Sequence, residues 1–105
     1  MKYLVTLVDA PNQSGSCNVT DDNGNVYGID YNIRTLPDNN IIMDISVNDV
    51  VQRKGVICTN KMPLVPTNIL NGNLYFQDIY GDENPVYTEF NTRFQLIYDT
   101  EFRLG

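Results

Sequence analysis

Apolar and polar residues alternate along most of this chain, and the alternation repeats every second position. In residues 26–34 the aromatic or aliphatic positions are Tyr27, Ile29, Tyr31 and Ile33, separated by small or polar residues. Such a period predicts half-buried β-strands, because successive side chains of a strand point to opposite faces of its sheet. We expect strands over residues 2–8, 16–20, 26–34, 41–48, 52–59, 74–80 and 90–99.

Turn-forming residues separate these strands at intervals of roughly 8–12 residues, the spacing typical of a β-sandwich or β-barrel. The strongest turn signal is Asn23-Gly24 within residues 21–25, since both residue types tolerate a positive φ angle. Asn71-Gly72 predicts a second tight turn. The pattern therefore predicts antiparallel strands joined by short hairpins.

Length and composition predict a single domain. The chain has 105 residues, of which 42% are hydrophobic, and shows no linker-like stretch or internal repeat. This size suits one hydrophobic core. No run of a dozen residues has the spacing of an amphipathic helix, and at most residues 66–70 form one helical turn. We expect an all-β fold over residues 1–105, a single small antiparallel β-barrel or sandwich.

The charge balance excludes some classes of partner. The net charge is −6, from 7 basic and 13 acidic residues, and Arg53-Lys54 is the lone adjacent basic pair. Nucleic-acid-binding proteins gain most of their affinity from Lys and Arg that neutralise phosphates. We therefore expect neither nucleic acid nor an anionic membrane surface as a partner. No transmembrane stretch is present, and residues 1–8 are too short for a signal-peptide core.

Catalytic signals are lacking. The chain has no His, which is the commonest general base and zinc ligand, and no glycine-rich phosphate loop. Cys17 and Cys58 lack the paired spacing of a zinc site and are expected to be unpaired, mostly buried thiols. The sequence predicts a protein that is not an enzyme and that has no catalytic residue, cofactor or metal.

Two acidic patterns in the sequence have simpler explanations than a metal site or a catalytic pair. Asp21 and Asn23 stand at oxygen-ligand spacing for calcium, but a plain hairpin explains residues 21–25 better. Asp30 and Asp44 fall on the polar faces of neighbouring expected strands, where a pair of carboxylates could serve glycoside hydrolysis. A solvated sheet face is the better explanation of both residues.

A series of short motifs then runs in order from Tyr27 to Tyr98. They are YGIDYNIR (27–34), MDI (43–45), GVI (55–57), PL (63–64), GNL (72–74), GDENP (81–85) and TRFQLIY (92–98). In this series, which covers roughly seventy residues, the chain resembles the baseplate plug family of contractile-tailed bacteriophages. Ile41-Ile42 stands where the family often has Trp. Asn91 stands where it often has Gly, and Asn also tolerates positive φ.

The resemblance implies a structural virion protein. Such a plug lies at the centre of the tail baseplate hub, closes the tail tube and binds neighbouring tail proteins of the hub, tube and spike. Self-association in the particle, assembly in the host cytoplasm and displacement or opening on infection are further implications. The role requires no cofactor and no acid–base pair, in agreement with the missing His.

Two other functions remain open at this stage. One is a small free-standing β module that recognises a carbohydrate or a protein, which predicts a monomer with a concave aromatic patch of Tyr75, Tyr80 and Tyr87. The other is a small hydrolase.

Contacts of a plug are expected in loops whose apolar residues are not used by the core. Residues 62–66 are apolar and stiffened by two prolines, and aromatic residues surround the turn at residues 81–85. Tyrosine is a typical interface anchor. The tip at residues 21–25 is expected to make no such contact. The predicted partner-binding residues are Met62, Leu64, Val65, Tyr80, Tyr87 and Phe90.

Overall fold

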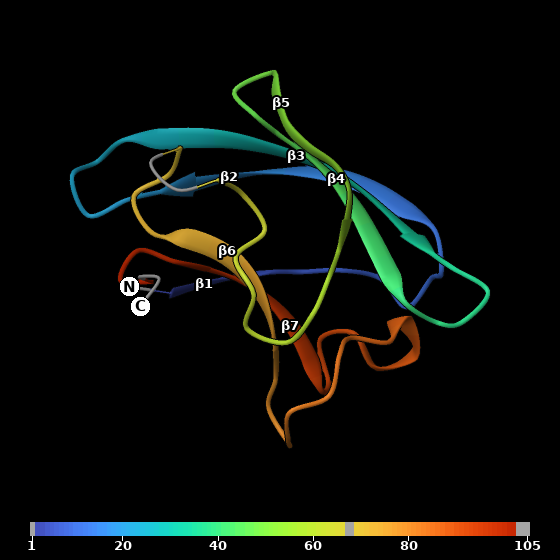
Figure 1. The fold of residues 1–105 in the computed structure, drawn as a ribbon. Coiled ribbons are helices and arrows are strands. Elements are labelled where there is room, and N and C mark those ends of the chain that lie inside the picture. Colours follow the sequence, from blue (N-terminus) through green and yellow to red (C-terminus); the bar gives the residue numbers. More distant parts are fainter. Residues whose placement is uncertain (1, 67–68, 103–105) are drawn as a thin grey trace.

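The fold is all-β, as predicted. The computed structural model describes residues 2–66 and 69–102. Within them the chain forms seven strands and one short 3₁₀ helix, η1 (Tyr87–Glu89), which lies between the last two strands in the sequence (Figure 1). The strands are β1 (Lys2–Val5), β2 (Gln13–Thr20), β3 (Val26–Thr35), β4 (Ile41–Val47), β5 (Val50–Ile57), β6 (Asn73–Asp78) and β7 (Phe94–Asp99). Each overlaps one of the strands expected from the alternation. The helical turn expected at residues 66–70 falls partly outside the described residues.

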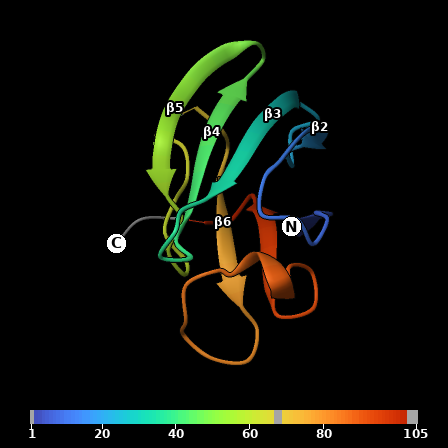
Figure 2. The same ribbon diagram turned by 90° about the vertical axis from the view of Figure 1, so that its right-hand side faces the viewer.

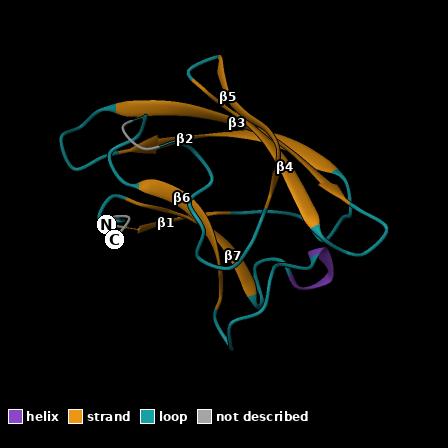
Figure 3. Ribbon diagram, in the orientation of Figure 1, coloured by secondary structure: helices purple, strands orange, loops and turns teal. Residues whose placement is uncertain are grey.

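The described strands form two antiparallel sheets. One has the strand order β1-β7-β6 and the other β2-β3-β4-β5 (Figures 2 and 3). Consecutive strands pair as hairpins in the larger sheet, whereas in the smaller sheet β7 lies between β1 and β6. The two sheets do not close into a barrel within the residues that the structure describes.

Both sheets contribute to one hydrophobic core. Burial alternates along β4, as expected of a half-buried strand: Ile41, Met43, Ile45 and Val47 are at most 4% exposed, and the residues between them are more exposed. From the other strands the same cluster takes side chains of both sheets. They include Ile29, Ile33, Leu74, Phe76, Phe94, Leu96 and Tyr98.

The predicted hairpin at Asn23-Gly24 is confirmed, with a positive φ at Gly24 and not at Asn23, and the chain bends at Gly72. Gly24 has a φ of +85° in the β2–β3 hairpin. Gly72 has a φ of +92°, and a Cβ atom there would lie 1.9 Å from the backbone oxygen of Asp99. The β4–β5 turn uses Asn48 and Asp49, both with positive φ, so β4 ends one residue before the end of the strand expected over residues 41–48. Asn48 is further held by its side-chain oxygen, which accepts from the Gly28 amide at 2.8 Å.

Candidate interaction surface

The segment that follows β5 covers the outer edge of β6. Asn60 and Phe76 form a parallel bridge, the Lys61 amide donates to the Phe76 carbonyl at 2.7 Å, and the Leu64 amide donates to the Leu74 carbonyl at 2.9 Å. This course turns the middle of the segment inward. Residues 60–65 therefore act as a cover for the sheet edge.

Leu64 and Val65 are core residues, which corrects the expectation that this loop exposes them. They are 0% and 1% exposed and belong to the hydrophobic cluster. The Asn73 side chain fixes Val65 by accepting from its amide at 3.1 Å and donating to its carbonyl at 2.9 Å. Met62 is the one residue of the three that the solvent reaches, with 53% of its surface exposed.

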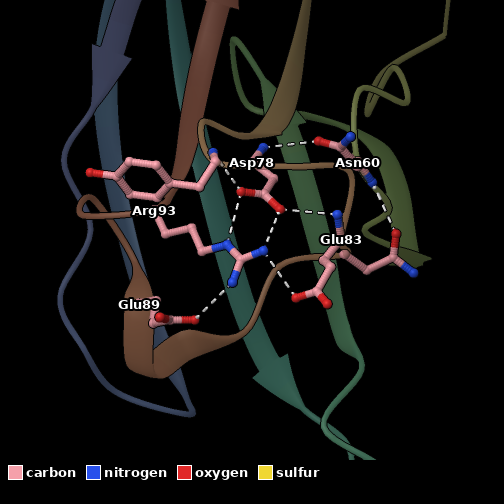
Figure 4. A network of polar contacts seen from close by, with 7 residues as sticks. Asn60, Asp78, Glu83, Glu89 and Arg93 are labelled. Carbon is pink, nitrogen blue, oxygen red and sulfur yellow. Dashed lines mark hydrogen bonds and ion pairs between the residues drawn. The ribbon is translucent and has the colours of Figure 1, made fainter.

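The loop between β6 and β7 is anchored by Arg93. Its Nε donates to Asp78 Oδ1 at 2.9 Å and its Nη2 to Oδ2 at 2.8 Å, so the pair is bidentate (Figure 4). Nη2 also lies 3.1 Å from Glu83, and Nη1 lies 4.0 Å from Glu89. The Asp78 side chain is fully buried. One guanidinium therefore ties both ends of the loop to its acidic middle.

The ion pair shifts both ionisation equilibria. Hydrogen bonds from the Arg93 guanidinium hold the pKa of the Asp78 carboxyl well below its usual range, against the effect of burial. The amides of Glu83 and Tyr80 add two more donors to the same carboxylate. Asp78 in turn raises the pKa of Arg93. Both groups are thus charged throughout the physiological pH range.

Asn60 joins the two segments that the sequence singled out. Its side-chain oxygen accepts from the Asp78 amide at 2.9 Å, and its own amide donates to the Asn84 side chain at 3.2 Å (Figure 4). Residues 60–62 and the loop of residues 79–92 therefore lie side by side. Sequence reasoning treated them as separate regions.

The aromatic residues around this loop differ in exposure. Tyr80 is 76% exposed, and Tyr87 is half-buried against the core. Phe90 is 1% exposed and stacks on Phe76 with ring centroids 5.7 Å apart, which corrects the expectation that it is available for contacts. Ile79, which the sequence reasoning did not select, is 42% exposed beside Tyr80. The exposed members of this surface are thus Met62, Ile79 and Tyr80, with Tyr87 at its margin.

Tyr75 is buried and does not belong to the exposed surface of Met62, Ile79 and Tyr80. It is 5% exposed and donates its hydroxyl to Asp99 at 3.0 Å. Burial, the hydrogen bond and the Asp99 charge raise the pKa of Tyr75 to about 12. Tyr75 therefore cannot form a concave patch with Tyr80 and Tyr87.

Acidic and thiol groups are used structurally. Asp44 accepts from Arg34 at 2.9 Å and from the Gly55 amide at 2.7 Å, while Asp30 lies opposite Ser46 in the β3–β4 register. Cys17 is half-buried and Cys58 is buried, and both are free thiols. Over the described ranges 2–66 and 69–102, no three His, Cys, Asp or Glu residues group as metal ligands. Within those ranges no helix has the length and apolar character to span a membrane.

Fold and surface together define a small all-β protein that presents a few apolar side chains on a stiffened loop. The chain belongs to a bacteriophage baseplate family: the family described as cyanophage baseplate Pam3 plug gp18 matches residues 1–101. No curated protein matches the chain. Family membership identifies a structural protein of the virion tail baseplate.

Proposed function

We propose that this protein is the plug that closes the tail tube at the centre of the baseplate, held there by hub and tube proteins. The family match supports the location, since it covers residues 1–101. The single observation that supports a contact role is the 76% exposure of Tyr80 on a loop whose base is an ion pair. The Tyr80 amide donates to Asp78, so the backbone that carries this ring is already held in place, which lowers the entropy cost of burying the ring against a partner.

We propose that the contacts to neighbouring baseplate proteins, and to other copies of the plug, lie on Met62, Tyr80 and Tyr87. Leu64, Val65 and Phe90 contribute indirectly, because their burial fixes the backbone that carries these three residues. The tip at residues 21–25 makes no contact in this arrangement. Asp21 supports that view, because its carboxylate is already occupied by donors from Asn25, Asn23 and Tyr27.

The first prediction tests the contact surface. Replacing Tyr80 by Ser should leave the isolated protein folded and lower its incorporation into assembled particles by tenfold or more, since loss of an interface anchor costs about 2 kcal/mol. The copies of plug per particle are measured by quantitative mass spectrometry. The matched control is Val50→Ser, which changes an apolar residue that is also 60% exposed but lies on the edge strand β5.

A separate experiment tests whether the protein closes the tail tube. Particles that assemble without the protein should have an open tube end in electron micrographs and should lose DNA prematurely. Normal incorporation of Tyr80→Ser would reject this contact surface. A closed tube in particles that lack the protein would reject the plug role itself.

A further inference from the structure

The edges of the two sheets are protected to very different degrees. Unpaired strand edges invite pairing with other chains, and proteins usually block them with charges, prolines, bulges or covering segments. β6 is covered by residues 60–65. β5 carries Arg53 and Lys54 and is distorted by register shifts where Gly55 has a φ of +65°. β1 has a length of only 4 residues.

Within residues 2–66 and 69–102, none of these protections is found at β2. Its sequence, QSGSCNVT, contains no charged residue and no proline. It pairs with β3 in unbroken register from Gln13 opposite Ile33 to Thr20 opposite Val26, so no bulge interrupts it. An eight-residue, regular and uncharged edge is the form that pairs most readily with an added strand.

The register shows which backbone groups of β2 are available. Gly28 of β3 directs its backbone groups towards β4, because its carbonyl accepts from the Asn48 amide. Successive residues of a strand direct their backbone groups to opposite sides within the sheet, so Tyr27 and Ile29 direct theirs to β2. Their partners in β2 are the odd-numbered residues. The even-numbered residues therefore direct their N–H and C=O groups away from β3. These are Ser14, Ser16, Asn18 and Thr20.

No hydrogen bond reaches the outward groups of those four residues from elsewhere in residues 2–66 and 69–102. Beside them is a cleft of about 370 Å³ that separates β2 from β1 and is lined by residues 3–6, residues 16–19 and Tyr31. At one end Gln13 ties β2 to the loop after β1 by donating to the Val8 carbonyl at 2.7 Å. β1 and β2 are consecutive strands of the chain but belong to different sheets and form no ladder with each other (Figure 1).

Tyr31 forms part of the cleft wall because Gly15 lies opposite it. A Cβ atom at Gly15 would lie 2.6 Å from the Tyr31 hydroxyl oxygen, so the ring lies across the bare backbone of β2. The hydroxyl forms no hydrogen bond with the described residues. It is a polar group in a cleft, at the side of an open strand edge.

The charges around the edge favour one kind of occupant. Asp9 and Asp22 are exposed near the two ends of β2, and Asp30 is exposed on β3 opposite Ser16. A second copy of this chain would bring the same acids and its own net charge of −6. A segment that carries Lys or Arg would meet complementary charge.

We propose that β2 docks an extended segment of another baseplate protein as an added fifth strand, with a basic side chain of that segment facing Asp30, opposite Ser16. The segment pairs with the outward backbone groups of Ser14, Ser16, Asn18 and Thr20 and packs over Tyr31 and β1. This inference rests on the baseplate role proposed above and assigns a second contact surface, separate from Tyr80.

The test removes one outward amide. Ser16→Pro deletes the outward N–H while the β2–β3 ladder, which uses the odd-numbered residues, retains its donors. Incorporation into assembled particles should fall tenfold or more. The matched control, Ser16→Ala, loses the hydroxyl but keeps the N–H and should incorporate normally. Circular dichroism and thermal melting of the isolated variants establish folding. If Ser16→Pro does not fold, Asn18→Lys tests the same edge without a backbone change.

A second pair of variants tests the occupant. Asp30→Lys should lower incorporation, whereas Asp49→Lys at the β4–β5 turn should not. Equal incorporation of these two variants overturns the basic-segment assignment.

Normal incorporation of folded Ser16→Pro or Asn18→Lys overturns the added strand. Self-association of the isolated protein that Ser16→Pro abolishes, seen by analytical ultracentrifugation, would make a second copy the occupant and also overturn the proposal. Absence of the wild-type protein from baseplates would instead reject the proposed function.

Discussion

Arg93 shows how a single side chain stabilises a long loop. Its two parallel hydrogen bonds to Asp78 require the planar fork of a guanidinium, which the ammonium group of lysine does not have. The guanidinium carbon also lies 5.1 Å from the centre of the Phe94 ring. Position and charge are therefore both fixed before any partner binds.

This ion pair predicts a pH dependence of stability. The folded pKa of Asp78 is lowered, so its contribution is present above its unfolded pKa of about 3.9 and is lost as the pH falls below that value. Arg93→Met should lower the free energy of unfolding at pH 7. The difference from wild type should shrink as the pH falls from 4 towards 2, because Asp78 then takes up a proton in the folded variant, whereas Arg93 keeps it charged in folded wild type. Urea unfolding at each pH measures both effects.

Arg34→Met is the matched control for that series. Arg34 forms one hydrogen bond to Asp44 with both side chains substantially exposed, a setting in which ion pairs contribute little. It should change the free energy of unfolding slightly at every pH. A difference between wild type and Arg93→Met that stays constant from pH 7 to pH 2 would contradict the role given to Asp78.

At the scale of elements, the cover over β6 predicts a sharp contrast within one short segment. Leu64 is fully buried, so Leu64→Ala should lower the free energy of unfolding by about 2–5 kcal/mol through lost burial and a cavity. Met62→Ala, at a residue that is 53% exposed, should change it by less than about 0.5 kcal/mol. Chemical denaturation of both variants decides the matter, and equal effects would show that the segment is not a cover.

Strands and hairpins were predictable here because their signals are local. Alternation in β3 and β4 and the Asn23-Gly24 turn depend on neighbours in the sequence, and the structure has them as expected. Asn91 is a further case, with a φ of +67° where the family often has Gly. Its side chain also accepts from the Leu7 amide and donates to the Leu7 carbonyl, contacts that no local pattern reveals.

The site was less predictable, because exposure depends on distant contacts. Leu64, Val65 and Phe90 look like free apolar residues in loops, yet each is buried by packing against β6 or the core around it. Conversely, Val50 and Ile57 lie in a strand and are 60% and 55% exposed, because β5 is an edge. Apolar character in a loop therefore does not by itself show which side chains are exposed.

For the whole molecule, the topology could not be read from the sequence. β7 pairs with β1 from the other end of the chain, with Tyr3 opposite Tyr98, and separates β1 from β6. Hairpin signals specify neighbours in sequence, whereas this pairing is set by the core that both sheets share. Tyr98 is fully buried within it and donates its hydroxyl to the Asn71 carbonyl at 2.6 Å.

The shared core predicts that the chain unfolds as one unit, as a single domain should. The two sheets share one hydrophobic core, because side chains of β3 and β4 pack in one cluster with those of β6 and β7. Loss of either sheet would therefore expose the core of the other, and chains of this length usually unfold in two states. Urea unfolding followed by tyrosine fluorescence and by far-ultraviolet circular dichroism should give coincident transitions. Tyr98→Phe should shift both midpoints together, since it leaves the Asn71 carbonyl without its donor. Separate transitions for the two probes would show that the sheets fold independently and that the chain is not one domain.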